Sequence, residues 1–168
     1  MKPRITDRAR LAQALLATPY RRGGSDWAAV DCFGLVELWL WNLHGVAVSD
    51  RLDMPPGPDG LEDGFGRFDT SQWVEVTGAC RDDDVLFFRQ SVPVLNAKGE
   101  LTGRRIIEHG HCGVMTGGKF LHAFELRAPS TNEAGEEDPG GGIVRVEEMT
   151  RAWERRISAV LRRVELNQ

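Results

Sequence analysis

The sequence has few cysteines, no excess of basic residues and no long apolar run, and each shortage excludes a class of protein. Its three cysteines among 168 residues are an odd number without regular spacing, so a disulfide scaffold is not expected. No two of them are spaced as Cys-x-x-Cys, which argues against a structural zinc site built on thiolates. The net charge of -4 argues against binding to nucleic acid or to an anionic membrane, because both usually require a basic face.

No segment reaches the length that a membrane-spanning helix needs. The N-terminal region is polar and basic, and the run from Leu11 to Ala17 is too short and too interrupted for the core of a signal peptide. We therefore expect a protein that is made in the cytoplasm and is not exported by the ordinary secretory route. The length suits one domain, residues 1–168, and no internal repeat or linker divides it.

The segment Asp31–Leu43 predicts an amphipathic helix with a cysteine in its first turn. Its apolar side chains recur at helical spacing and form one stripe: Cys32, Leu35, Val36, Trp39, Leu40 and Leu43. Asp31 is the candidate N-cap, and a thiol beside it lies at the positive end of the helix dipole, where the thiolate is favoured. A buried structural cysteine fits the same stripe, so the segment alone leaves both interpretations open.

The remaining pattern is one helix before this segment and short strands after it. The helix is expected at about Thr6–Ala17, the strands at Trp73–Val76, Asp84–Phe88, Val92–Leu95, Arg104–Ile107, His111–Met115, Lys119–Phe124, Ile143–Val146 and Arg156–Val164, a short helical turn at Met149–Arg155, and long loops at Asp50–Gly66 and Glu125–Gly142. Helices followed by antiparallel strands indicate an α+β fold in which the Cys32 helix lies across the sheet.

The clearest hairpin joins His111–Met115 to Lys119–Phe124 through Gly117-Gly118. With those glycines as the loop, Gly113 lies opposite His122, and strand alternation places His111 and His122 on one face. The two rings are then diagonal neighbours, with the small Gly113 leaving room between them. This arrangement suits a general base and the partner that orients it.

Three interpretations of the histidines follow from the residues. In the first, Cys32 meets the face that carries His111 and His122, and the inward face of the helix therefore packs against the two rings. In the second, both histidines are ordinary strand residues satisfied by solvent or backbone. In the third, His109 joins them in a three-histidine zinc site, although Glu108 and Gly110 place His109 in the entry loop.

Five short motifs occur in order along the chain: Tyr20-Arg21-Arg22-Gly23-Gly24, Asp31-Cys32-Phe33-Gly34-Leu35-Val36, Asp84-Val85-Leu86-Phe87-Phe88, His111-Cys112-Gly113-Val114 and Phe120-Leu121-His122-Ala123. Together they resemble the NlpC family of papain-like cell-wall peptidases. The resemblance covers about Tyr20 to Ala123, and it implies a papain-like α+β fold without a cofactor. It also implies a cysteine peptidase, of the DL-endopeptidase kind, that acts on the peptide stem of peptidoglycan next to a D-γ-glutamyl or diaminopimelate residue.

The resemblance also implies roles for single residues. Cys32 corresponds to the nucleophile, His111 to the general base and His122 to the polar residue that orients His111. Tyr20 corresponds to the tyrosine whose hydroxyl lies near the nucleophile, and Asp31 to the acidic residue before it. The backbone amide of Cys32 would help to hold the oxyanion. Cys80 and Cys112 are interpreted as structural.

The sequence departs from the family pattern at two positions: Phe33 replaces the usual serine after the cysteine, and Asp83 replaces a glycine before Asp84. Phe33 and the segment from Ile143 to Ile157 are similar to the branch found in tailed-phage and prophage tail modules, which lacks a signal peptide. That branch implies a component of the virion tail tip that opens the cell wall during genome entry, with other tail proteins as partners.

Two further functions stay open at this point. Trp41 lies off the apolar stripe, which fits a structural tail-tip subunit with a weak or inactive peptidase site. An amidase or acyltransferase would use the same residues, because a fold and a triad do not determine the substrate.

Overall fold

The computed structural model describes residues 4–48, 68, 72–127, 130–131, 137–138 and 140–164. In those ranges the helices are α1 (Arg8–Leu16), α2 (Cys32–His44) and α3 (Arg151–Glu154). Two short antiparallel pairs are formed by β1 (Ser25–Asp26) with β2 (Ala29–Val30), and by β7 (Ser130–Thr131) with β8 (Glu137–Asp138). No helix of the described ranges combines the length and the apolar character needed to cross a membrane.

The central sheet is antiparallel, and in the described residues its strand order is β3-β10-β4-β5-β6-β9. The strands are β3 (Trp73–Glu75), β4 (Val85–Leu95), β5 (Leu101–Thr116), β6 (Lys119–Arg127), β9 (Gly141–Glu148) and β10 (Ile157–Arg163). The predicted α+β class, with a helix packed on an antiparallel sheet, is confirmed.

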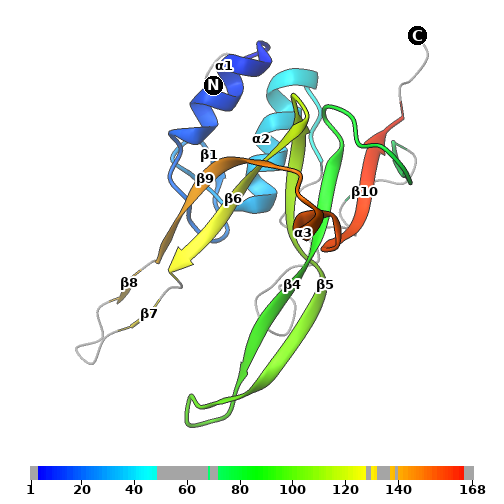
Figure 1. Cartoon of the computed structure of the whole chain (residues 1–168). Helices are drawn as coiled ribbons and strands as arrows, with labels where there is room; N and C mark the ends of the chain where they lie inside the picture. The colour runs from blue at the N-terminus through cyan, green and yellow to red at the C-terminus, as the bar shows by residue number, and fades with distance from the viewer. Residues whose placement is uncertain are drawn as a thin grey trace.

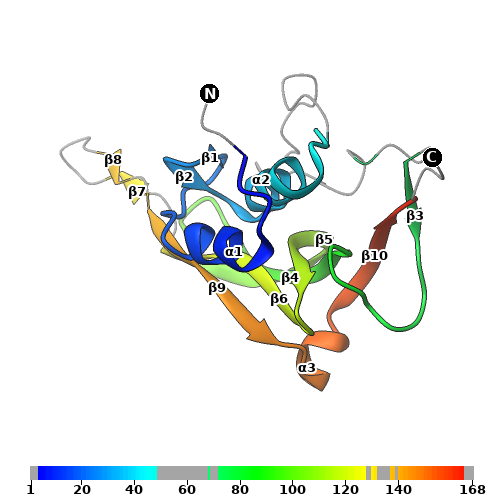
Figure 2. The ribbon, with the colours of Figure 1, turned by 90° about the horizontal axis from the view of Figure 1, so that it is seen from above.

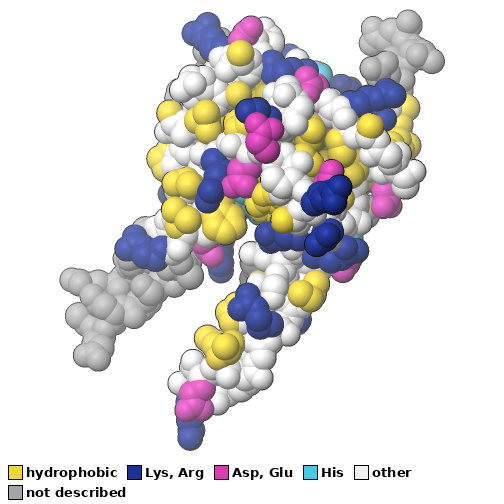
Figure 3. Space-filling view, in the orientation of Figure 1, with side chains coloured by type: hydrophobic (Ala, Val, Ile, Leu, Met, Phe, Trp, Pro, Cys, Tyr) yellow, Lys and Arg dark blue, Asp and Glu magenta, His cyan; other side chains and the backbone are white. Residues whose placement is uncertain are grey.

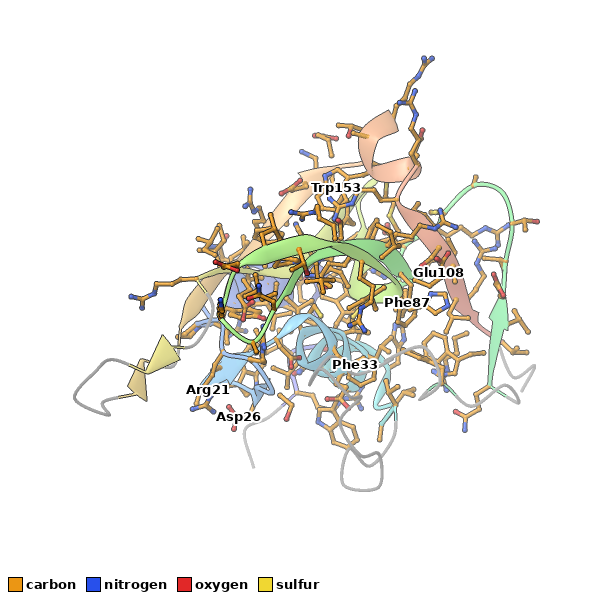
Figure 4. The ribbon with its side chains drawn as sticks, turned by 90° about the horizontal axis from the view of Figure 1, so that it is seen from below. Arg21, Asp26, Phe33, Phe87, Glu108 and Trp153 are labelled. Atoms are coloured by element: carbon orange, nitrogen blue, oxygen red, sulfur yellow. The ribbon has the colours of Figure 1, made fainter. Side chains whose placement is uncertain are left out.

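Helices α1 and α2 lie on one face of this sheet, and α3 lies on the other (Figures 1 and 2). The main core fills the space between α2 and the sheet. It includes Leu35, Val36, Trp39 and Leu40 of the helix and Val85, Phe87, Cys112, Val114, Leu121 and Ala123 of the strands. A smaller core on the opposite face contains Leu86, Phe88, Met115, Phe120 and Val160, with Trp153 packed against it. Figure 4 shows Phe33 and Phe87 on the α2 side and Trp153 on the other.

Asp31, the predicted N-cap, and Gly45 cap the two ends of α2. The Asp31 carboxylate accepts a hydrogen bond of 2.8 Å from the Gly34 amide, as an N-cap does. Gly45 ends the helix in the left-handed conformation, with φ at 69°. These caps determine where α2 begins, and Cys32 is therefore its first residue.

The predicted register of the histidine hairpin is confirmed. Gly113 pairs with His122, and the two loop residues are Gly117 and Gly118, both with positive φ. An added Cβ on Gly113 would lie 2.8 Å from the Leu121 carbonyl oxygen and 3.1 Å from the His122 Cβ. A larger residue at position 113 would therefore displace His122.

The expectation that α2 covers the face of the two histidines is wrong. Strand alternation places His111 and His122 on the face of Phe88 and Phe120, and their ring centroids lie 5.9 Å from Phe88 and 4.9 Å from Phe120, respectively. The helix packs on the other face, because the apolar side chains of Val114, Leu121 and Ala123 point there. Cys32, the first residue of α2, lies near His111.

Two predicted boundaries also differ from the structure. The segments Val92–Leu95 and Arg104–Ile107 are the outer parts of the long strands β4 and β5, which project from the domain as an arm (Figure 1). The predicted loop Glu125–Gly142 is shorter at both ends, because β6 continues to Arg127 and β9 begins at Gly141. The predicted loop Asp50–Gly66 lies outside the described residues.

The substitution of Asp83 for glycine affects more than a turn. Asp83 adopts a positive φ of 70°, a conformation that costs a non-glycine residue energy. Its carboxylate accepts 2.8 Å and 2.9 Å hydrogen bonds from Trp39 Nε1 and Arg8 Nη2, respectively, so it ties α2 and α1 to the start of β4.

Candidate active site

Cys32 lies at the N-terminus of α2 because the preceding loop is fixed against the helix. Asp31 uses its second carboxylate oxygen to accept a 2.8 Å hydrogen bond from the Gly23 amide. Gly34 allows the loop to approach, since a Cβ there would lie 2.0 Å from the Gly24 carbonyl oxygen. The first amides of α2 have no carbonyl partner within the helix, so they are donors at its positive end.

The half-buried Cys32 opens into a cavity of about 220 Å³. The cavity is lined by Tyr20, Arg22, Gly23, Asp31, Cys32, Phe33, Gln90, Gly110, His111, Ala123, Phe124 and Glu125. The structure therefore brings four of the five predicted site residues, Tyr20, Asp31, Cys32 and His111, to one hollow. His122, the fifth, lies behind His111 and is completely buried.

His111 reaches Cys32 from the opposite face of the sheet at an irregular part of β5. The pairing of β4 with β5 shifts register between Phe88 and Gln90, and Gly110 fits against the Gln90 side chain. A Cβ on Gly110 would lie 2.8 Å from the Gln90 Cβ, so a larger residue at position 110 would displace the Gln90 side chain. The His111 side chain lies beside Cys32 and lowers the pKa of its thiol through a hydrogen bond and its charge.

The two histidines form a hydrogen bond of 2.8 Å between His111 Nε2 and His122 Nδ1. With Nε2 engaged, Nδ1 is the nitrogen of His111 that is left to bond the Cys32 thiol. Burial first, and then the nearby His111, lower the pKa of His122 to about 4, so His122 is neutral near pH 7. A neutral His122 can accept the His111 proton on Nδ1, which suits the orienting role.

Cys112, predicted to be structural, has a direct contact with the nucleophile. The predicted register is correct, and Cys112 points away from the face of His111, but that other face is the one that α2 covers. A hydrogen bond from the Cys112 thiol lowers the pKa of Cys32 most, and the bond from His111 and its charge lower it further, against the opposing effect of burial. The pKa of Cys32 consequently lies well below that of an ordinary thiol.

We expect iodoacetamide to alkylate Cys32 selectively near pH 6. An ordinary cysteine is less than about 1% thiolate at that pH, and burial raises the pKa of Cys80. As the pH falls from 8 to 6, labelling of Cys80 should decline about tenfold per unit, whereas labelling of Cys32 should stay nearly constant. Peptide mapping by mass spectrometry measures both rates in one sample. Equal rates at the two positions would contradict a low pKa of Cys32.

Tyr20 lines the cavity, and a single β-bridge between its backbone and that of Val30 holds it beside α2. Burial raises its pKa, and the nearby Cys32 thiolate raises it further, so the hydroxyl keeps its proton and remains a donor. Arg22 and Glu125 form an ion pair of 2.8 Å at the same cavity. The cavity therefore contains the neutral Tyr20 hydroxyl as a donor near the Cys32 thiol, and the Arg22–Glu125 ion pair.

The structure does not bring His109 into a metal site with the other two histidines. His109 Nδ1 lies 2.8 Å from Ser158 Oγ, and its ring packs against Phe87, on the α2 side of the sheet. Among the described residues, no group of three or more His, Cys, Asp or Glu side chains is placed to hold a metal ion.

A larger cavity of about 670 Å³ lies near the C-terminal part of α2, lined in part by Asp83, Asp84 and Arg162. These charged groups already pair with neighbours: Asp84 with Arg162 at 2.7 Å and Asp83 with His44 at 3.0 Å. No Cys, Ser or Thr side chain is among its described lining residues. The smaller cavity at Cys32 is therefore the candidate active site.

Sequence reasoning missed two contributors and could not explain a third residue. Cys112 contacts Cys32 and Glu147 contacts His122, two residues of the predicted triad, and both contacts join elements that are distant in the sequence. Phe33 is buried and packs edge-on against Phe68, with ring centroids 6.0 Å apart. The aromatic residue after the nucleophile therefore forms a wall of the cavity and extends the core.

The chain was compared with known families, curated proteins and solved structures, and only the solved structures gave a match, at low sequence identity. No known protein family matches the chain, and no curated protein does. Among solved structures, the chain is similar to "Crystal structure of NlpC/p60 domain of peptidoglycan hydrolase SagA", with a TM-score of 0.48 and 19% identity. The match covers 92% of this chain and 94% of that one. A likeness of this size assigns no activity, which has to be argued from the residues of the site.

Proposed function

We propose that the protein is a cysteine peptidase that hydrolyses the peptide stem of bacterial peptidoglycan. The observation that carries the proposal is the continuous contact from Cys32 to His111 to His122 at the N-terminus of a helix. A nucleophile, a base bonded to it and a group that orients the base are the parts that covalent catalysis requires. The lowered pKa of Cys32 supports the same role.

The reaction follows from the proton positions. The Cys32 thiolate attacks the peptide carbonyl, and the first amides of α2 stabilise the oxyanion that forms. The tetrahedral intermediate collapses as the C–N bond breaks, and His111, protonated on Nδ1, donates that proton to the leaving amine. Water then attacks the thioester while His111 accepts one of its protons, and the C–S bond breaks to restore the Cys32 thiolate. The new carboxyl group releases its remaining proton to solvent.

The choice of substrate rests on the resemblance of five sequence motifs to cell-wall peptidases. From that resemblance we propose cleavage next to a D-γ-glutamyl or diaminopimelate residue of the stem. The cavity carries Arg22 and Glu125, which pair with each other at 2.8 Å, and a zwitterionic peptide that separates this pair would find a partner there for each of its charges.

We further propose that the protein works at a phage tail tip, together with other tail proteins. The arm formed by the outer parts of β4 and β5 supports a role within an assembly, because it projects from the domain and presents apolar and basic side chains to solvent (Figure 3). Leu95, Leu101 and Ile106 on this arm are 55%, 63% and 57% exposed. Recovery of the protein in purified tails would support this placement, and its absence from them would contradict it.

A digest of purified peptidoglycan in water labelled with heavy oxygen tests the proposed reaction. The peptidase should release new peptide termini in which each new carboxyl group carries one heavy oxygen atom, detected by mass spectrometry. Protein blocked beforehand with iodoacetamide should release none. Cleavage between the sugar lactyl group and the first stem residue would indicate an amidase instead, and products joined to an added amine without label would indicate an acyltransferase. No product of any kind would favour a structural subunit.

A further inference from the structure

Glu147 lies directly behind the two histidines, on the side away from Cys32. Its Oε1 atom is 3.3 Å from His122 Nε2, within ion-pair distance although the alignment does not make a hydrogen bond. Glu147 reaches this position because β9 runs beside β6, where it pairs with Phe120 two residues before His122. His122 Nε2 is fully buried, and this carboxylate lies within ion-pair distance of it.

Two neighbours hold the Glu147 carboxylate in place. Trp153 Nε1 donates a 2.7 Å hydrogen bond to Oε2, and Arg145 Nη1 lies 3.1 Å from Oε1. Burial opposes the charge, but the bond from Trp153 and the contacts with His122 and Arg145 outweigh it and hold the pKa of Glu147 below its usual range. The group facing His122 is consequently an ionised acceptor in a fixed orientation.

An ionised acceptor at Nε2 determines where a neutral His122 carries its proton. The proton belongs on Nε2, facing the carboxylate, and Nδ1 is then an acceptor. His111 must therefore donate its Nε2 proton to His122 across the 2.8 Å contact. Its Nδ1 lone pair is left free to take the proton of Cys32, as the proposed reaction requires.

We propose that Glu147 is a positioning residue that sets the tautomer of His122, and through it selects Nδ1 of His111 as the base for Cys32. The inference rests on the proposed function only for its consequence in turnover, because the thiolate and the tautomer can be measured without a substrate. Without the carboxylate, the His122 proton can move from Nε2 to Nδ1. His122 Nδ1 then can no longer accept a hydrogen bond from a protonated His111 Nε2. The Cys32 thiolate then loses part of its stabilisation.

Other charged and titratable groups face the same chain of contacts. Arg145 of β9 lies near His122 and disfavours its protonation. Cys112 of β5, with Tyr20 and Asp31 on the α2 side, surrounds Cys32. The substitution of Glu147 leaves all of these groups in place, so a shift in the pH profile of Cys32 alkylation reports on Glu147 itself.

The test compares E147Q with E148Q, adjacent positions on one strand with the same loss of charge. Glu148 is exposed and pairs with Lys119 at 2.7 Å, on the opposite side of the strand. In E147Q the amide oxygen keeps the Trp153 bond, which turns the amide NH₂ toward His122 and favours a proton on Nδ1. We expect alkylation of Cys32 near pH 6 to slow by roughly tenfold, equivalent to an upward shift of about one unit in its pKa, with E148Q unchanged.

Heteronuclear NMR of the imidazole nitrogens shows which nitrogen of His122 carries the proton, and this would not change if Glu147 only stabilised the fold. The wild type should carry the His122 proton on Nε2, and E147Q should move it to Nδ1. E147D, which keeps the charge, should restore much of the wild-type pH profile. An unchanged tautomer, or a wild-type alkylation profile in folded E147Q, would overturn the inference. If the wild type instead cleaves no peptidoglycan but shows these shifts, the proposed function fails and the role of Glu147 stands.

Discussion

Replacement of Cys32 by alanine is expected to abolish the release of peptides from peptidoglycan, lowering kcat/KM by roughly ten-thousandfold or more. The alanine variant has no group that can form the thioester, and the other residues of the site then act on no nucleophile. The fold should survive, because Cys32 lies at the edge of the core and α2 keeps its Asp31 cap. Product release is measured by liquid chromatography and mass spectrometry of the digest.

Cys80→Ala is the matched control for this loss. Cys80 is a half-buried cysteine packed against the smaller core on the opposite face, and it takes no part in the proposed chemistry. Its variant should digest peptidoglycan at the wild-type rate. Comparable digestion by Cys32→Ala would rule out the cysteine mechanism, whereas circular dichroism that shows unfolding would call for Cys32→Ser as the replacement variant, with the same loss expected.

Replacement of His111 by alanine should lower turnover by about a thousandfold and remove the reactivity of Cys32 near pH 6. The substitution deletes both the base and the positive charge that helps to lower the pKa of Cys32. The hydrogen bond from Cys112 and the helix N-terminus remain, so alkylation should recover as the pH rises toward 8. Rates of alkylation across this pH range separate the two contributions.

His109→Ala is the control for His111→Ala, because both positions lie on β5 and lose the same ring. His109 bonds Ser158 and packs against Phe87, so its removal should cost some stability but leave the pH profile of Cys32 unchanged. An equal effect of the two substitutions on alkylation would contradict the assignment of His111 as the base.

The elements that depend on local chemistry could be predicted from the sequence. The N-cap Asp31 marks the first residue of α2, and the glycine pair 117–118 determines the register in which Gly113 faces His122. Both features depend on residues within a few positions of one another. The shared face of His111 and His122 followed from that register alone.

The arrangement of layers could not be predicted in the same way. Both faces of the hairpin carry apolar residues, such as Phe120 on one and Leu121 on the other, so alternation does not reveal which face a helix covers. The wrong choice hid the contact of Cys112 with Cys32. It also hid Glu147, whose relation to His122 depends on the pairing of β9 with β6 across a long connection.

The sheet divides the proposed catalytic residues between its two faces. Cys32 and Tyr20 line the cavity proposed to take the substrate, whereas His122, Glu147 and Trp153 lie in the rear layer, and His111 contacts both sets. Substitutions at the front can therefore alter which peptide is accepted without disturbing the proton positions, which the rear layer determines. If the proposed function is correct, recognition and proton placement can be engineered separately, the former through the loop at Tyr20 and the end of β6 at Glu125, and the latter through β9 and α3.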